Sequence, residues 1–257
     1  MSNVFRDQYQ ALVLAAKPVG YWPLTINGND STSYARHARY CGSPEFISDD
    51  TGGWLHLDGS SFLEVPGHSD YSQPASLNGL TVEVWMKAHS LHYPNLKRYI
   101  HWLGKGEPQK QEWGFRLYSD DGAEPSMVSA YVWNKEGGEG AGAHLRSAIS
   151  SKQWMYLVAC FEPGDASDPD RGVLIYRDGE FQQGPLSPTT LYDHAPRWRI
   201  FPASVDAPLR FGTRSDPTRS PQPGCLEGGL AEIAIYPRVL EHSEIIAHFQ
   251  AGAACFL

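Results

Sequence analysis

Residues 227–252, EGGLAEIAIYPRVLEHSEIIAHFQAG, join a strand pattern to a helix pattern and decide how the whole chain is interpreted. In LAEIAIY (230–236), alternation places Glu232 on one face of a predicted strand, inside an otherwise apolar run. A carboxylate in a buried strand is costly unless a cation or hydrogen-bond donors pair with it. Glu232 therefore faces either a bound cation or an exposed side of the sheet.

Helices are predicted at both ends of the chain. Apolar residues recur at helical spacing over residues 4–16, and Pro18 ends that pattern. Near the C-terminus, Ile245, Ile246 and Phe249 form an apolar stripe over residues 241–251. Gly252 suits the left-handed residue that terminates a helix.

Strand patterns fill the region between these helices. WLHL (54–57) and FLEV (62–65) flank Asp58-Gly59, and GVLIYRDGEFQ (172–182) contains a second Asp-Gly pair, so each favours a hairpin. In LTVEVWMKA (80–88), the even-numbered apolar positions share one face. Without βαβ alternation, the pattern predicts an all-β, antiparallel β-sandwich jelly roll with short N-terminal and C-terminal helices. We expect one domain over 1–257, with helix 4–16, sandwich 19–237 and closing helix 241–251.

Composition and charge limit the partners. The chain has 257 residues and a formal net charge of −8, which argues against binding a nucleic-acid backbone. No run reaches the ~18 apolar residues of a membrane span, and no secretory signal pattern opens the sequence. We therefore expect a soluble protein with no nucleic-acid partner, and an extracellular or virion-associated role stays open.

Six stretches carry a family resemblance: AKPVGYWPL, LHLDGSSFLEVP, LTVEVWMKA, VLIYRDGEF, LRFGT and GGLAEIAIYPRVLEHSEIIAHFQAG (228–252). They resemble laminin-G-like modules of the concanavalin-A-like lectin/glucanase superfamily, in the family's order and over nearly the whole chain. The resemblance implies a jelly roll with one concave sheet that binds carbohydrate or protein. The chain departs from the family pattern at Glu241, where the family usually has a Ser or Thr helix cap.

The resemblance also implies calcium as a cofactor. The acidic residue at the position of Glu232 often ligates calcium in the family, and Asn27 and Asp30 lie in the loop after the first strand. Calcium takes six to eight oxygen ligands, which carboxylates and loop carbonyls supply. The alternative is an outward-facing carboxylate beside a turn-forming Asn and Asp.

Tryptophan is abundant, with eight residues in the chain. Sugars stack on exposed aromatic rings while nearby polar groups bind their hydroxyls. The hypothesis is that a glycan or glycoconjugate, or alternatively a protein, binds at a surface formed by Trp113, Trp133, Asn134 and Trp198. Packing in the core is the alternative for each tryptophan.

Catalytic motifs are sparse. Retaining glycosidases need two carboxylates about 5–5.5 Å apart, and the superfamily's glucanases supply them from Glu-x-Asp-x-x-Glu. This chain contains no Glu-x-Asp. His92, Tyr93 and His101 are the weak candidates for a polysaccharide lyase. The leading prediction is a carbohydrate-binding, lectin-like module; the alternatives are a lyase or hydrolase on the same fold, and a structural or adhesion module of a virion or multiprotein assembly.

Overall fold

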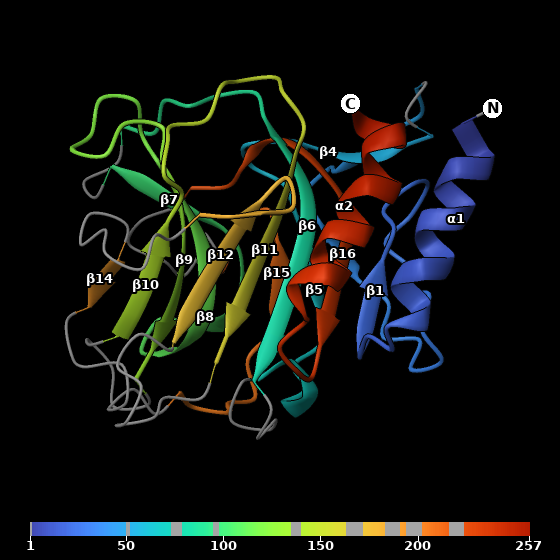
Figure 1. Cartoon of the computed structure of the whole chain (residues 1–257). Helices are drawn as coiled ribbons and strands as arrows, with labels where there is room; N and C mark the ends of the chain where they lie inside the picture. Colours follow the sequence, from blue (N-terminus) through green and yellow to red (C-terminus); the bar gives the residue numbers. More distant parts are fainter. Residues whose placement is uncertain are drawn as a thin grey trace.

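The computed structural model describes residues 2–49, 52–72, 79–94, 98–134, 140–162, 172–182, 191–193, 202–215 and 224–257. Two antiparallel sheets pack face to face, and helices α1 (Ser2–Ala15) and α2 (His242–Phe256) cover the outer side of one of them (Figure 1). The predicted all-β sandwich with a short helix at each end is confirmed.

The sheet beneath the helices is sheet A. Its strands run in the order β13 (Glu180–Phe181), β12 (Val173–Arg177), β11 (Met155–Phe161), β6 (Leu80–Ala88), β16 (Glu227–Tyr236), β4 (Trp54–Asp58) and β3 (Glu45–Ile47), with β1 (Gly20–Trp22) paired to β16.

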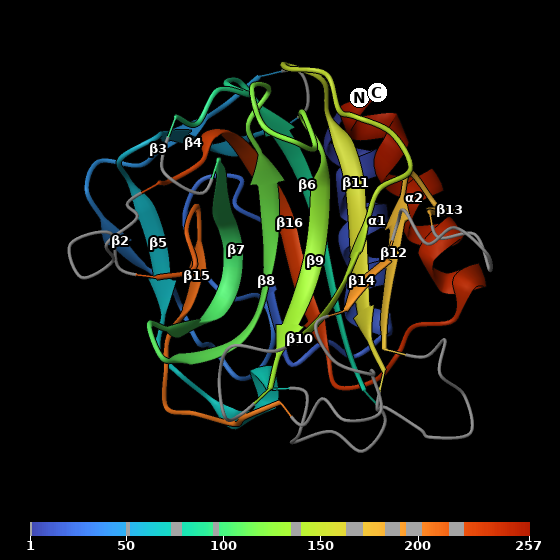
Figure 2. The same cartoon turned by 90° about the vertical axis from the view of Figure 1, so that its left-hand side faces the viewer.

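Sheet B forms the opposite layer (Figure 2). Its strands run in the order β14 (Leu191–Asp193), β10 (Gly140–His144), β9 (Val128–Trp133), β8 (Lys110–Tyr118), β7 (Tyr99–Glu107), β15 (Leu209–Phe211), β5 (Phe62–Val65) and β2 (Arg39–Cys41). A short 3-10 helix, Ser69–Tyr71, follows β5.

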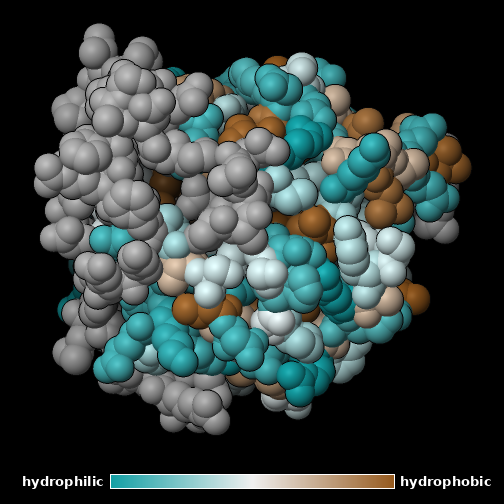
Figure 3. Space-filling view, turned by 90° about the horizontal axis from the view of Figure 1, so that it is seen from below, coloured by the Kyte–Doolittle hydropathy of each residue, from teal (hydrophilic) through white to brown (hydrophobic). Residues whose placement is uncertain are grey.

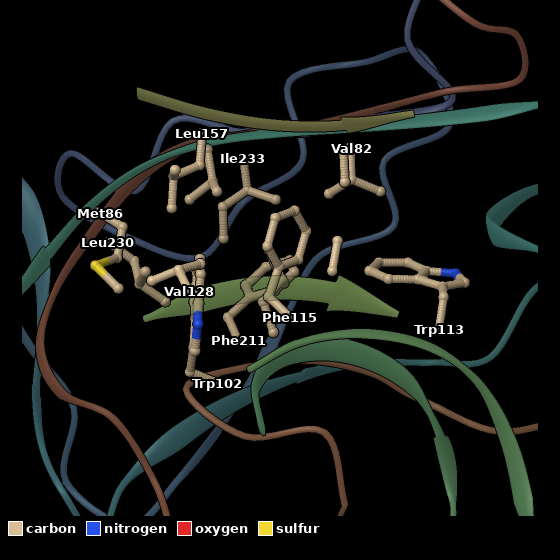
Figure 4. Packing of buried hydrophobic residues seen from close by; sticks show 14 of the residues in the cluster. Val82, Met86, Trp102, Trp113, Phe115, Val128, Leu157, Phe211, Leu230 and Ile233 are labelled. Atoms are coloured by element: carbon tan, nitrogen blue, oxygen red, sulfur yellow. The ribbon is translucent and has the colours of Figure 1, made fainter. Parts of the chain in front are cut away.

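The main core lies between the two sheets. Sheet A contributes the predicted alternate residues of β6, including Val82 and Met86, and sheet B contributes Trp113 and Phe115 (Figure 4). Because these side chains alternate along their strands, the intervening residues face away from this core. Each sheet therefore has an outer face formed by the side chains that do not enter this core.

A second apolar layer joins the outer face of sheet A to the two helices. Tyr9 of α1, Trp85 of β6 and Phe256 of α2 are buried in it, and the Trp85 and Phe256 rings stack 4.5 Å apart. The expectation that Gly252 ends the closing helix is wrong, because α2 continues to Phe256. A Cβ at position 252 would lie 2.7 Å from the Trp85 ring, so glycine is needed there for close packing.

A buried polar cluster sits inside this second layer. The Glu83 carboxylate accepts hydrogen bonds from the hydroxyls of Tyr156 and Tyr236, the latter at 2.7 Å. His248 of α2 places Nδ1 2.8 Å from the same carboxylate. Glu83 therefore links three elements, because these partners come from β11, β16 and α2.

Of the two hairpins predicted at Asp-Gly pairs, the structure contains one. The hairpin at Asp178-Gly179 is confirmed, because β12 and β13 pair across it. The hairpin at Asp58-Gly59 is wrong, because β4 lies in sheet A and β5 in sheet B. Asp58 accepts hydrogen bonds from the amides of Ser60 and Ser61 at 2.9 and 2.8 Å, which shapes a turn that crosses the sandwich.

Strand β16 also departs from simple alternation. Its register with β6 shifts between Ala231 and Ala234, and Glu232 there has a φ of 54°. As a result Leu230 and Ile233 both join the main core, although strict alternation would place them on opposite faces. This bulge turns Glu232 toward the helices.

Candidate functional site

Glu232 is paired with a cation of the protein itself. Its carboxylate accepts a hydrogen bond from Arg6 Nε of α1 at 2.6 Å, and the Tyr21 hydroxyl donates to the other oxygen. Glu232 is fully buried and Arg6 is only 4% exposed. Burial raises the pKa of Glu232, and the Arg6 guanidinium opposes that effect. The ion pair therefore connects α1, which carries Arg6, to β16 of sheet A, which carries Glu232.

The three expected calcium ligands do not fit a calcium ion as they are arranged. Both Asp30 oxygens accept hydrogen bonds within the chain, including those from the Tyr21 and Arg36 amides at 3.0 and 2.9 Å. The Asn27 side-chain oxygen accepts from the Asn29 amide at 3.0 Å. A calcium site needs six to eight oxygens with free lone pairs, whereas these side chains serve Arg6 and the loop backbone.

Calcium titration tests the calcium prediction. Thermal unfolding of metal-stripped protein, with calcium and with EDTA, gives a calcium-dependent shift in Tm. Because Glu232 pairs with Arg6, we expect Glu232→Gln to lower Tm but to leave that shift unchanged. A shift of several degrees that disappears only in the variant would restore Glu232 as a ligand.

The outer face of sheet B carries a cluster of arginine and aromatic side chains. Trp113 and Phe115 of β8 point into the core, so the next residue, Arg116, points outward. The cluster, called here the arginine–aromatic face, consists of Tyr99, His101, Arg116, Tyr131, Trp133 and Arg214.

Arg116 is the centre of this face. Its guanidinium carbon lies 4.3 Å from the centroid of the Tyr131 ring and 5.3 Å from that of Trp133, within cation–π range. Its Nε donates to His101 Nε2 at 3.0 Å. These contacts hold the guanidinium against the rings of β7 and β9.

Arg214 belongs to the segment that follows β15, and its side chain extends over strands β7 and β8. Gly104 and Gly114 are register partners, and a Cβ on either would come within 3.1 Å of the Arg214 side-chain carbons. The guanidinium carbon is 4.9 Å from the Trp133 ring centroid. Arg214 is 6% exposed, and burial together with Arg116 lowers its pKa to about 10.

The expected ligand residues separate into three groups. Trp133 belongs to the arginine–aromatic face, and Asn134 follows it, half-buried. Trp113 is wrong as a ligand contact, because it is fully buried in the core and its indole N–H donates to the Tyr71 carbonyl at 2.8 Å. Trp198 lies outside the described residues.

The weak catalytic candidates lie in different environments. His101 contacts Arg116, whereas His92 is exposed with Nδ1 2.9 Å from Asp120. The buried Tyr93 donates its hydroxyl to the Ser90 carbonyl at 3.0 Å. In the described part of the chain, one group could hold a metal: His92, Asp120 and Asp121, all exposed, with ligand atoms within 4.8 Å of one another.

Arg116, Tyr131 and Arg214 were not anticipated from the sequence. A signal existed for the first two, because WGFRLYS and MVSAYVW alternate and place them opposite the apolar face. Arg214 had no local signal. Its position depends on glycines of β7 and β8 that lie at least a hundred residues earlier in the chain.

Comparison with known proteins identifies the fold. No protein-family model and no curated protein matches the chain. Domain 4 of AbnA, a GH43 extracellular arabinanase from Geobacillus stearothermophilus solved with arabinotriose, superposes with a TM-score of 0.61 at 16% identity, covering 91% of this chain and 98% of that domain. Matches at this identity establish a shared β-sandwich and leave the laminin-G assignment a prediction.

Toxin domains show the same likeness. The receptor-binding domain of botulinum neurotoxin mosaic serotype C/D gives a TM-score of 0.63 at 11% identity, over 91% of this chain and 51% of that one. The binding domain of Paraclostridial Mosquitocidal Protein 1 gives 0.58 at 12% identity, over 86% and 48%. The chain thus spans about half the length of these toxin domains. None of the helices described in this structure is long and apolar enough to cross a membrane.

Proposed function

We propose that this chain is a glycan-recognition module that binds sugar through the arginine–aromatic face of sheet B. The observation that carries the proposal is Trp133, a 5%-exposed indole on the outer face of sheet B that has two guanidinium carbons within 5.3 Å of its ring centroid. Aromatic rings stack on the C–H faces of sugars, and guanidinium and imidazole groups bind their oxygens. The face combines both kinds of group.

The margin of this face is open to solvent. Tyr99, His101 and Tyr118 are half-buried, and the Tyr99 ring lies 5.3 Å from His101 and 5.5 Å from Tyr118. Trp133, in turn, lies 5.4 Å from His101. A sugar that approaches over Tyr99 and His101 therefore meets a continuous set of rings leading to Trp133.

The fold comparisons support a binding role in general terms. One neighbour was solved with a bound arabinose oligosaccharide, and others are receptor-binding domains. The rival role, a structural module of an assembly, needs a broad apolar surface. On the face seen in Figure 3, the apolar residues that are not drawn grey form small, separate patches among hydrophilic ones.

Removal of the central indole tests the proposal. We expect Trp133→Ala to weaken binding of array-identified glycans at least about tenfold, equivalent to ~1.4 kcal/mol, because the stacking surface is lost. Isothermal titration measures the affinity, and Trp154→Ala, which removes a half-buried indole packed against Phe256, is the matched control. A folded Trp133→Ala protein with unchanged affinity would refute the proposal, and release of reducing or unsaturated ends would instead indicate an enzyme.

A further inference from the structure

Arg214 carries a buried charge that the described part of the chain does not pair. Its Nε and Nη1 atoms are buried and have no hydrogen-bond partner there. A guanidinium in this state is costly, since buried polar groups are almost always hydrogen-bonded and buried charges are paired. Arginine also has the planar donor geometry that matches carboxylate and sulfate oxygens. The side chain therefore has donors that the described part of the chain leaves unused.

Glu107 favours the charged form of Arg214, but it does not form an ion pair with it among the described residues. Glu107 and Glu64 both form ion pairs with Arg210, whose Nη1 donates to the Arg214 backbone carbonyl at 3.1 Å. A second cation against the Trp133 ring, Arg116, disfavours the charged form of Arg214. This part of sheet B is locally positive on a chain whose net charge is −8.

Two glycines hold the Arg214 side chain in place. Its aliphatic carbons lie over Gly104 and Gly114, where a Cβ would approach them to 3.1 Å, and its guanidinium lies against the Trp133 ring. A charged group fixed in this way loses little conformational entropy when a ligand binds. The arrangement is that of a pre-organised anion receptor on a stacking surface.

From these contacts we infer that the arginine–aromatic face selects glycans that bear an anionic group, a carboxylate or a sulfate, which is bound by Arg214 with Arg116 beside it. This inference rests on the proposed function and specifies its ligand class. The sugar ring would stack on the aromatic residues while its anionic oxygens take the free donors of Arg214, forming charge-assisted hydrogen bonds.

Inorganic sulfate is the first probe. At low millimolar concentrations, where general exclusion of sulfate from protein surfaces has little effect, we expect sulfate to raise the Tm of the wild-type protein more than chloride does at equal ionic strength, because it binds the folded state. Arg214→Met should abolish this difference while keeping a Tm at or above that of the wild type, since it removes an unpaired buried charge. Arg39→Met, which removes an arginine 68% exposed at the edge of the same sheet, should retain it. An Arg214→Met protein that responds to sulfate like the wild type would overturn the inference.

Matched glycans then separate this inference from the proposed function. Oligogalacturonides and their neutral methyl esters differ at the carboxyl group, and carrageenan oligosaccharides and their neutral desulfated forms differ at the sulfate group. We expect at least one acidic member to bind at least tenfold more tightly than its neutral partner, with that preference lost in Arg214→Met. Equal binding of acidic and neutral partners that still depends on Trp133 would overturn the anionic preference and leave glycan recognition standing. Absence of glycan binding throughout, on these probes and on an array, would overturn both.

Discussion

Glu83→Ala is expected to lower the free energy of unfolding by about 3–5 kcal/mol, the cost of breaking a buried charge-paired network. The Glu83 carboxylate is the common acceptor of Tyr156, Tyr236 and His248, and all of these groups are buried. Without it, two hydroxyls and an imidazole are left without their acceptor beneath the helices. Urea denaturation followed by circular dichroism measures the change, and a loss below about 1 kcal/mol would contradict the role given to Glu83.

The pH dependence supplies the control for this prediction. Burial opposes the charged form of His248, but the Glu83 carboxylate outweighs it and raises the pKa of His248. A raised folded-state pKa stabilises the fold fully below the unfolded value of about 6.5, and the contribution is lost as pH rises through the folded-state pKa. Glu83→Gln keeps the side-chain shape without the charge. The stability difference between the wild-type protein and Glu83→Gln should therefore shrink as pH rises above about 6.5.

Arg6→Met is expected to cost a similar ~3–5 kcal/mol, because it leaves the Glu232 carboxylate buried without its guanidinium. The guanidinium also lies 4.8 Å from the Phe256 ring, so this one side chain connects α1 to both sheet A and α2. Chemical denaturation measures the loss. Detachment of α1 would also appear as a change in tryptophan fluorescence, because Trp85 lies in the same apolar layer.

A double variant isolates the ion pair from lost packing. Arg6→Met with Glu232→Gln leaves no unpaired charge, so it should be more stable than Arg6→Met alone by at least about 1 kcal/mol. Equal or lower stability of the double variant would show that Arg6 acts by packing on Phe256. In that case the ion pair with Arg6 would not account for the presence of a carboxylate at position 232.

Local patterns predicted most of the fold. Alternation in residues 80–88 correctly assigned the core face of β6, and helical spacing located α1 and the start of α2. Features that depend on distant partners were not predictable. The turn at Asp58 has hairpin chemistry, yet which sheet receives β5 is decided by pairing with β15 and β2. Likewise, a glycine at position 252 is typical of a helix end, but it is needed there because a Cβ would lie 2.7 Å from the Trp85 ring.

The candidate site was predicted only in part, for the same physical reason. The sequence predicts Trp133 as a ligand residue and His101 as a catalytic candidate, but the Arg214 side chain that joins Trp133 comes from a distant segment. Glu232 was recognised as anomalous, but its partner Arg6 lies at the opposite end of the chain. A pattern search within one segment finds an unusual charge and cannot find what neutralises it.

The place of β16 in the sheet has a consequence for the order of folding. This strand hydrogen-bonds to β1, β4 and β6, and the pair Gly20↔Ile235 joins residues from opposite ends of the chain. During synthesis, the edges of those three strands and the docking surface of α1 stay incomplete until β16 and α2 emerge. Such long-range closure makes folding slow and leaves unpaired strand edges open to aggregation in the meantime. A nascent chain arrested before residue 227 would therefore be a natural client for chaperones.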